Sequence, residues 1–434
     1  MMESLWKQTV SLPSFPPLRQ DIQTDVLIIG GGMAGLLCAY LLTRDGVDCT
    51  LIEAGRLCGG VTGNTTAKIT SQHGLIYDKL IRKFGTETAR MYLRVNEEAL
   101  AQYRTLSRSI PCDFEERDSF VYSTDDLRPI ERELDALERI GFDAVFAKDL
   151  PLPMAVAGAV RFPRQAQFHP LKFIGGILPG LRIYEHTKAR EFVGTTVLTG
   201  HGKIRAGKII VTTHFPLLNK HGAYFLKLYQ QRSYVLALEG AANVDGMYVD
   251  RAEQGLSFRT HGGMLLLGGG SHRTGKQGGN WETLSSFAKT HYPQAREVSR
   301  WATQDCMTLD GVPYIGQYGG RTKGLYVATG FNKWGMTSSM AAAMVLRDMV
   351  QERKNPYEDL FSPSRRILRP QLAINALEST VNLLTPTAPR CPHLGCALKW
   401  NPQEHSWDCP CHGSRFTPEG RLLDNPATGD LKRK

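Results

Sequence analysis

Two short blocks near the C-terminal end of the chain combine residue types that bind transition metals. Cys391 and His393 lie two positions apart in the first block, and Cys409 and His412 lie three positions apart in the second. Two thiolates suit one iron ion and two imidazoles suit another, and this mixed ligand set is typical of a [2Fe–2S] centre that transfers single electrons. The blocks therefore predict a redox metal centre with these four side chains as ligands.

Two other arrangements use the same side chains. Two cysteines and two histidines also form closed tetrahedral zinc sites, so residue type alone does not separate zinc from iron. Structural disulfides are a further alternative, but nothing in the chain indicates secretion and they would leave the interleaved histidines without a role. The sequence around the ligands favours the iron–sulfur centre.

The two blocks, CPHLGC at 391–396 and CPCHGS at 409–414, resemble those of the Rieske proteins of respiratory and photosynthetic cytochrome complexes. The resemblance implies a disulfide between Cys396 and Cys411, which would join the two ligand loops. It also implies that the hydroxyl of Ser414 donates a hydrogen bond to a cluster sulfide.

Other parts of the cluster segment both support this resemblance and depart from it. Asn-Pro-Ala at 425–427 resembles the third loop that covers Rieske clusters, whereas Phe416 stands where the family usually has a tyrosine that donates to a cysteine sulfur. Hydrogen bonds to the sulfurs raise the reduction potential, so the sequence predicts a midpoint below the top of the Rieske range. The segment begins near Pro386 and shows no strands ahead of the first ligand loop, which predicts a minimal cluster unit that depends on the rest of the chain.

Composition limits the class of protein. The chain has 434 residues, 42% of them hydrophobic, which is enough for two or three domains with apolar cores. It contains no apolar run of about 18 residues, as a membrane span requires, and its first residues lack the apolar core of a signal peptide. We therefore expect no membrane span and a cytoplasmic location. The cysteines outside the cluster blocks have no paired spacing and are expected to be reduced: Cys38, Cys49, Cys58, Cys112 and Cys306.

The formal net charge of +10 is the unusual feature of the composition. Such a balance occurs in nucleic-acid-binding proteins, but here the basic residues alternate with acidic ones and form no long stripe. A basic surface would attract an acidic electron carrier such as a ferredoxin or a flavodoxin. The charge is equally compatible with a solvated surface that has no special purpose.

A nucleotide-binding pattern lies near the N-terminus. The apolar run 25–29 predicts a buried parallel strand, and it leads into Gly30, Gly32 and Gly35 and then a helical pattern. The first glycine permits a tight turn, the second lets the backbone approach a pyrophosphate, and the third lets helix and strand pack closely. The N-terminus of the helix would bind the phosphates.

A second strand at 48–52 ends at Glu53, about 20 residues after the glycines, where a ribose hydroxyl needs an acceptor. Strand, glycines, helix, strand and acid in this order predict dinucleotide binding. These residues alone leave FAD and NAD open. The Gly/Thr-rich loop at 54–68 favours FAD, because a nicotinamide domain usually proceeds to its next crossover at this point.

Residues 25–350 resemble the D-amino acid oxidase and glycine oxidase superfamily of FAD-dependent oxidoreductases, through the loop at 54–68 and through a strand at 325–330 followed by FNKWGMT. The superfamily has a helix that starts at the flavin pyrimidine ring, which we expect here from about Ser338 to Val350. The resemblance implies cofactor contacts at Ala54, Arg56, Thr62, Thr65, Lys188, Gly330, Gly335, Met336 and Thr337.

The expected fold class is α/β, with a Rossmann-like FAD-binding domain, an inserted antiparallel-sheet substrate domain and a small β-rich Rieske-type domain. The predicted divisions are FAD-binding parts at 21–79, 151–227 and 301–350, a helical part of the substrate domain at 80–150 and its sheet at 228–300, a linker and helix at 351–385, and the minimal Rieske domain at 386–434.

The substrate side of the site is less defined by the sequence. Alternation of apolar and polar residues predicts strands at 234–240 and 263–270. Arg273 is a candidate for binding a carboxylate, although loop arginines are more often solvated, and Lys68 and His73 have the same ambiguity. In this superfamily the protein mainly orients the substrate and tunes the flavin, so we name no catalytic base.

These features predict an enzyme, an FAD-dependent oxidoreductase that passes electrons between a small organic substrate, such as an amine or amino acid, and an external carrier through FAD and a [2Fe–2S] cluster. The alternative is a redox sensor or electron carrier without an organic substrate of its own. A nucleic-acid-modifying flavoprotein is suggested by the charge alone, and we expect no nucleic-acid partner.

Overall fold

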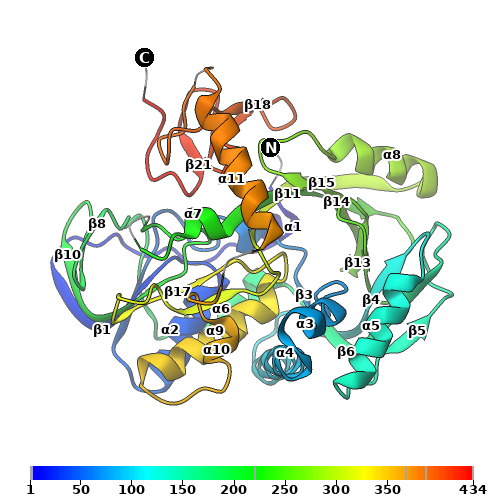
Figure 1. Ribbon diagram of the computed structural model, residues 1–434, viewed down its shortest axis with the longest axis horizontal. Helices are drawn as coiled ribbons and strands as arrows, with labels where there is room; N and C mark the ends of the chain where they lie inside the picture. The colour runs from blue at the N-terminus through cyan, green and yellow to red at the C-terminus, as the bar shows by residue number, and fades with distance from the viewer. Residues whose placement is uncertain (1–2, 219–220, 367–368, 387–388, 433–434) are drawn as a thin grey trace.

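The computed structural model describes residues 3–218, 221–366, 369–386 and 389–432, and it contains two large sheets with a small third sheet docked on them (Figure 1). The first sheet has the strand order β16-β17-β10-β1-β2-β7. Its centre is parallel, with β1 (Ile22–Ile29) between β10 (Lys203–Val211) and β2 (Cys49–Ile52). The other strands are β7 (Arg182–Tyr184), β17 (Leu325–Thr329) and the antiparallel β8 (Glu191–Val193), β9 (Thr196–Leu198) and β16 (Tyr314–Gln317).

Helices cover this sheet because its central strands are apolar on both faces. α2 (Met33–Arg44) follows β1 and packs against α9 (Gly335–Val350), and both are buried over most of their length. A helix with so little solvent contact carries apolar residues nearly all round. The other helices of the body are α1 (Leu5–Thr9), α3 (Tyr77–Phe84), α4 (Thr86–Ser107), α5 (Arg128–Arg139), α6 (Pro170–Ile177), α7 (Tyr224–Lys227), α8 (Trp281–His291) and α10 (Glu358–Phe361).

The second sheet is mainly antiparallel and has the order β15-β11-β14-β13-β12-β4-β6-β3. Its long strands β11 (Leu228–Glu239), β14 (Met264–Arg273) and β15 (Arg296–Thr308) pair antiparallel, in agreement with the strands predicted for the substrate side. The remaining strands are β3 (Lys68–Ile69), β4 (Glu115–Ser123), β5 (Val145–Ala147), β6 (Gly158–Gln167), β12 (Met247–Asp250) and β13 (Ser257–His261).

The expected fold class is confirmed, with an α/β body and a small C-terminal sheet. Strands of the first sheet come from three separate stretches of the chain, 22–52, 182–211 and 314–329, so the part that carries the glycine motif is discontinuous as expected. One local expectation was wrong: α9 begins at Gly335, about one turn before Ser338, because the chain turns sharply at Asn332 and Lys333, where φ is 51° and 72°. The exact domain boundaries stay predictions.

The C-terminal segment forms α11 (Pro370–Leu384) and an antiparallel sheet of β18 (Lys399–Asn401), β19 (Ser406–Asp408), β20 (Arg415–Phe416) and β21 (Leu422–Asp424). In Figure 1 it lies against the body beside α7 and β11. Between 351 and the first ligand loop, the part of the chain that the structure describes contains helices and a single bridge, Arg390 to Ala397, and no strand. Among the described residues no helix is both long and apolar enough to cross a bilayer.

Candidate flavin cavity and cluster centre

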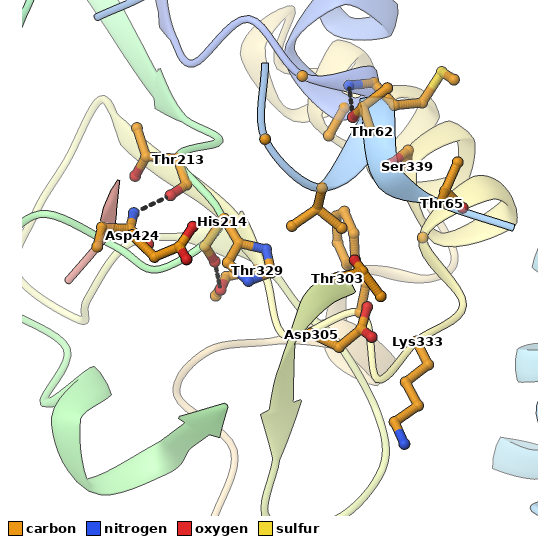
Figure 2. A pocket seen from close by; sticks show the side chains of 18 of the residues that line it. Thr62, Thr65, Thr213, His214, Thr303, Asp305, Thr329, Lys333, Ser339 and Asp424 are labelled. Carbon is orange, nitrogen blue, oxygen red and sulfur yellow. Dashed lines mark hydrogen bonds between the residues drawn. The ribbon is translucent and has the colours of Figure 1, made fainter. Parts of the chain in front are cut away.

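A cavity of about 910 Å³ opens where the carboxyl ends of β1 and β2 meet the second sheet. Its wall includes the glycine turn, the loop at 54–66 and the start of α9, as the sequence predicted. The residues at 422–430 of the cluster segment belong to the same wall. Figure 2 shows this arrangement, with Thr62, Ser339 and Asp424 pointing toward one space from different segments. A volume of this size holds a large cofactor together with a small substrate.

The glycine turn has the close contacts that its sequence requires. Gly30 has a φ of 117°, and a Cβ atom added there would lie 2.7 Å from the carbonyl oxygen of Thr212. A Cβ atom on Gly35 would lie 2.0 Å from the carbonyl oxygen of Gly30, so this residue lets helix and strand approach. Gly32 is the N-cap of α2 and lines the cavity, and the N-terminus of a helix favours an anion.

Glu53 lies at the cavity wall directly after β2, and its role as a ribose acceptor stays a prediction. Its carboxylate accepts hydrogen bonds from the backbone N–H groups of Gly31, at 2.7 Å, and Gly55, at 2.8 Å. Thr62 accepts from the N–H of Met33 at 3.0 Å and so supports the start of α2. These contacts hold the two dinucleotide-binding loops in one geometry before any cofactor binds.

The other predicted contacts divide into two groups. Ala54, Thr65, Lys188, Gly330, Gly335 and Met336 line the cavity. Arg56 also borders it, but its guanidinium pairs with the buried carboxylate of Glu185. The hydroxyl of Thr337 lies 2.9 Å from the carbonyl oxygen of Thr70 and from Nε2 of His73, and this residue is not part of the cavity wall that the structure describes. Thr337 therefore supports the start of α9 through its neighbours and does not face the cavity.

His73, a candidate for the substrate side, is instead held by hydrogen bonds within the protein. His73 is buried, with Nδ1 2.6 Å from the hydroxyl of Tyr92 and Nε2 2.9 Å from the carbonyl oxygen of Thr70. Burial lowers the pKa of His73 to about 3, so the ring is neutral. Lys68 instead lines the cavity, and burial, reinforced by the nearby charge of Arg259, lowers its pKa to about 7.

Two ionisable groups in the cavity were missed by the sequence reasoning. Asp305 on β15 and Lys333 in the turn before α9 lie next to each other in Figure 2. Burial raises the pKa of Asp305 to about 6, while the charges of Lys333 and Arg232 act in the opposite direction. The Nζ of Lys333 donates to Ser271 at 2.8 Å, and burial lowers its pKa. The sequence places the basic residue Lys333 in the turn directly before the predicted flavin helix, and this position was the signal that could have identified it.

The predicted cluster ligands are brought together by the two loops of the C-terminal segment. Cys391 and Cys409 belong to one buried cluster, and the rings of His393 and His412 are 5.0 Å apart between centroids. Nδ1 of His412 is buried without a hydrogen-bond partner among the described residues, whereas Nε2 lies 2.9 Å from the carbonyl oxygen of Phe225. A buried ring nitrogen left in this state is costly unless it binds a metal, so the donor set fits a [2Fe–2S] cluster.

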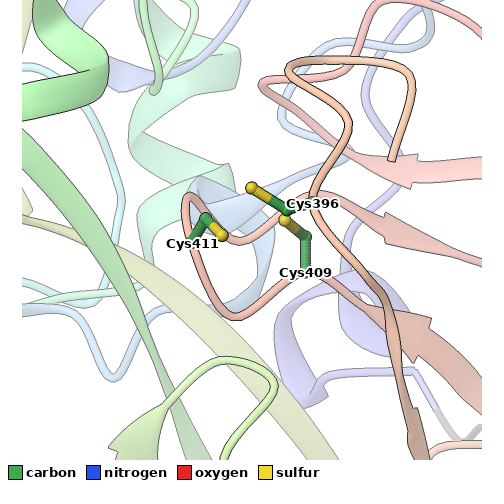
Figure 3. Close-up of side chains that lie close together, drawn as sticks. All are labelled: Cys396, Cys409 and Cys411. Carbon is green, nitrogen blue, oxygen red and sulfur yellow. The ribbon is translucent and has the colours of Figure 1, made fainter. Parts of the chain in front are cut away.

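The second cysteines lie beside these ligands. The sulfurs of Cys396, Cys409 and Cys411 are all within 4.8 Å of one another, and Figure 3 shows the three side chains converging. The cysteines are free thiols in the structure, so the disulfide between Cys396 and Cys411 stays a prediction that their closeness supports.

Ser414 and Phe416 lie in the same segment as the predicted ligands, and the bond from Ser414 to a cluster sulfide stays a prediction. The hydroxyl of Ser414 accepts from the N–H of Ala427 at 2.9 Å, which joins a ligand loop to the third loop. Phe416 is fully buried in the apolar cluster that contains Cys391 and Cys409. The phenyl ring therefore fills space near the ligand sulfurs and supplies no hydrogen bond.

The ligand loops are held on the body by buried polar contacts. Arg273, considered above as a carboxylate ligand or a solvated residue, is neither: it donates to the carbonyl oxygens of Pro410 and Cys411, both at 3.0 Å. The amide of Gln230 donates to the carbonyl oxygen of His412 at 2.8 Å. These contacts fix the second ligand loop against β11 and β14.

A short segment at 212–215 connects the cavity with the cluster centre. Its first three residues line the cavity, and the ring of Phe215 lies 6.0 Å from that of His393 and 6.3 Å from that of His412. Asn425 of the third loop also lines the cavity and donates to two carbonyl oxygens of this segment. The two candidate cofactor sites are therefore adjacent.

Comparison with known proteins agrees with this geometry. Residues 25–349 match the family model FAD dependent oxidoreductase, and residues 376–433 match the model Rieske [2Fe-2S] domain. Along its whole length the chain is similar to a Bacillus subtilis (strain 168) protein named Rieske 2Fe-2S iron-sulfur protein YhfW, at 36% identity over 99% of this chain and 97% of the relative.

Two further proteins are similar to the larger part of the chain. Gamma-glutamylputrescine oxidoreductase of Escherichia coli (strain K12) is 25% identical over 78% of this chain and 86% of that protein. The crystal structure of glycine oxidase from Geobacillus kaustophilus has the same fold, with a TM-score of 0.67 and 19% identity, covering 80% of this chain and 99% of that one. The chain belongs to the FAD dependent oxidoreductase family, whose members bind FAD, and it carries a C-terminal Rieske domain, which binds a [2Fe–2S] cluster.

Proposed function

We propose that this enzyme oxidises a small amine or amino acid and passes the electrons through FAD and the Rieske cluster to an external carrier protein. When bound, FAD accepts an electron pair as hydride and the cluster accepts single electrons. The observation that carries the proposal is the shared cavity wall, in which the glycine turn and residues 422–430 of the cluster segment face the same space. An attached one-electron centre at this position would have no use in an enzyme that reacts directly with oxygen.

The groups in the cavity suit a substrate that carries an amino group. Asp305 and Lys333 have opposite charges and line the cavity side by side. The carboxylate of Asp305 would attract an ammonium group, and the Nζ of Lys333 would bind a carboxylate in place of its contact with Ser271. The names of two similar proteins, a gamma-glutamylputrescine oxidoreductase and a glycine oxidase, point to the same substrate class.

The main chain at 212–215 connects the two sites. Thr213 and His214 border the cavity, and the next residue, Phe215, contacts both cluster histidines edge-on. We place the electron route in this segment. Asn425 would keep it in contact with the third cluster loop through the hydrogen bonds described above.

Anaerobic titration with candidate amines and amino acids tests the proposal. A true substrate should bleach the flavin absorbance and then produce the EPR signal of a reduced Rieske cluster. A Cys409→Ser variant, which should lose the cluster, is expected to retain flavin bleaching without the EPR signal. If dithionite reduces both centres but no amine or amino acid does so, the chain is a sensor or an electron carrier without an organic substrate.

The external carrier is expected to be an acidic protein such as a ferredoxin or flavodoxin, because the chain has a net charge of +10. A cytoplasmic location would fit this partner and reduced cysteines outside the cluster loops. Both points stay predictions, and transfer from the substrate-reduced enzyme to an added carrier is the measurement that checks the first.

A further inference from the structure

Helix α11 exposes large aliphatic side chains and buries two asparagines, the reverse of the usual surface helix. Asn375 and Asn382 are each only 3% exposed. Four exposed aliphatic side chains recur every three or four residues, so they lie on one face: Ile374 (53%), Leu377 (66%), Val381 (53%) and Leu384 (78%). Exposed apolar patches of this kind mark interaction sites on folded proteins.

The polar side of α11 explains why the helix cannot turn its apolar side inward. Asn375 accepts from Arg273 at 2.9 Å, and Glu378 forms an ion pair with Lys276 at 2.7 Å. The carbonyl oxygen of Asn382 accepts from the N–H of Ala397 at 2.9 Å, next to the first ligand loop. The helix is therefore fixed to the body and to the cluster loops, with its aliphatic side facing out.

The apolar surface continues onto the first ligand loop. Leu383 is exposed and lies against the loop, since a Cβ atom on Gly395 would be 3.8 Å from its Cδ2 atom. Leu394, one residue after His393, is 39% exposed. We call Ile374, Leu377, Val381, Leu383, Leu384 and Leu394 the α11 face. His393 lies next to Leu394, at the ligand-loop end of the α11 face, and is half-buried. His412 is buried, with Nε2 close to the carbonyl oxygen of Phe225. The α11 face therefore leads to the more accessible of the two predicted imidazole ligands.

The residues around the α11 face give it a positive border. Arg366, which precedes the helix, is exposed, and so is Arg390, which follows it and donates to the carbonyl oxygens of Leu383 and Gly395, both at 3.1 Å. Arg369 instead points to the body, with its guanidinium 5.1 Å from the centre of the Phe84 ring. The acidic residue of α11, Glu378, is neutralised by its ion pair with Lys276. An apolar patch with a positive border complements an acidic surface that has an apolar centre.

We propose that the α11 face is the docking site of the external electron carrier, a small acidic redox protein whose centre approaches the cluster at His393. This assignment rests on the proposed function, because it requires that electrons leave the cluster. A second copy of the chain is disfavoured as the occupant, since each copy has a net charge of +10 and the same positive border. An anionic membrane would match the charge, but it would not explain why the apolar surface ends at a ligand loop.

The test measures electron transfer from a dithionite-reduced plant-type [2Fe–2S] ferredoxin to the oxidised, full-length holoenzyme, followed by stopped-flow absorbance. This direction is energetically downhill, because a Rieske cluster has a higher reduction potential than a plant-type ferredoxin, and it requires the same docked complex as the reverse transfer. The second-order rate constant should fall at least tenfold in a Leu377→Ser/Val381→Ser double variant and severalfold in Arg390→Gln. It should also fall as the ionic strength rises, because opposite charges steer the encounter. Val193→Ser is the matched control, because Val193 is an exposed aliphatic residue of β8 (58%) outside the α11 face, and it should transfer at the wild-type rate.

Other outcomes overturn the assignment. If the wild-type rate is zero, is insensitive to salt, or equals the rate of the double variant, the carrier does not dock on the α11 face. Binding to phosphatidylcholine/phosphatidylglycerol vesicles that is lost in the double variant, with an unchanged ferredoxin rate, assigns the face to a membrane; loss of a dimer with the same unchanged rate assigns it to a second copy. The Rieske EPR signal of each variant checks folding. Flavin bleaching by amines is measured separately, so failure of the substrate proposal is distinguished from failure of the docking proposal.

Discussion

At the scale of single residues, Phe416 sets a clear expectation for the cluster. Its ring is fully buried in the apolar cluster that holds Cys391 and Cys409, and it cannot donate a hydrogen bond. A Phe416→Tyr variant should raise the midpoint potential by about 20 to 60 mV, if the added bond favours the reduced cluster by about 0.5 to 1.5 kcal/mol. Redox titration followed by EPR measures the shift. Phe416→Leu adds no donor and should not raise the midpoint; a rise in both variants would contradict the argument.

Asp305 gives the expected pH dependence. Burial raises its pKa from 3.8 to about 6, so the group is neutral at pH 5 and negative at pH 8. Only the negative form attracts a substrate ammonium group, and the rate of flavin reduction at low amine concentration should therefore rise as pH increases through about 6. Asp305→Asn should abolish this rise and increase the substrate KM at least tenfold. A variant that keeps the wild-type pH profile would exclude Asp305 from substrate binding.

The same pKa shift has a consequence for stability. Because the folded protein holds the proton more tightly than the unfolded chain, ionised Asp305 destabilises the fold at pH above about 6, and the cost disappears below 3.8. Asp305→Asn should therefore gain stability relative to the wild type between pH 4 and 6 and keep that gain at higher pH. Denaturation midpoints measured at pH 4 and pH 8 check the sign.

Several residues of the site could be predicted from the sequence, and others could not, for physical reasons. Ligand spacing in Cys391–His393 and Cys409–His412 and the glycines at 30–35 are local patterns, because each sits within one turn of the chain. Asp305 and Lys333 come from a strand and a turn whose side chains meet only through the packing of two sheets. Arg273 illustrates the same limit, since its partners on the ligand loop are more than 130 residues away.

At the scale of elements, a buried ion network joins β11 to the C-terminal sheet. Arg232 of β11 and Arg415 of β20 both pair with Glu404, and Arg415 also pairs with Asp408; all four side chains are at most 4% exposed. Removing one partner of such a network leaves a buried charge without compensation. The network is therefore expected to hold the cluster segment against the second sheet.

Glu404→Gln tests this interface, because it leaves the buried guanidinium of Arg232 without its carboxylate. The expected destabilisation of the cluster segment is roughly 3 to 5 kcal/mol, measured as a lower urea midpoint for loss of the cluster absorbance, while FAD release changes less. Glu239→Gln is the matched control, since its pair with Arg296 is exposed and should contribute about 0 to 1 kcal/mol. Equal effects of the two substitutions would show that the network does not hold the segment.

Element positions were predicted well where the pattern was long and regular. The part predicted to be helical at 80–150 contains α4, whose apolar residues follow the helical period over 22 residues. The start of α9 was placed too late, since the left-handed residues that precede it have no simple sequence signal. The inverted burial of α11 could not be predicted either, because the usual rule assigns aliphatic side chains to the inside.

At the scale of the whole molecule, the cluster segment shares a cavity wall and hydrogen bonds with the body. It contributes residues 422–430 to the flavin cavity and receives hydrogen bonds from Gln230, Arg273 and Gln304. A fragment that starts at Pro386 would lack α11 and all of these donors. We expect it to fail to hold a cluster after reconstitution with iron and sulfide, whereas the full-length chain treated in the same way should give the Rieske EPR signal. Because Arg232 would also be missing, Glu404 would face water in the fragment and lose its partner from β11. A fragment with a stable signal would show that the body positions the cluster without being needed to hold it.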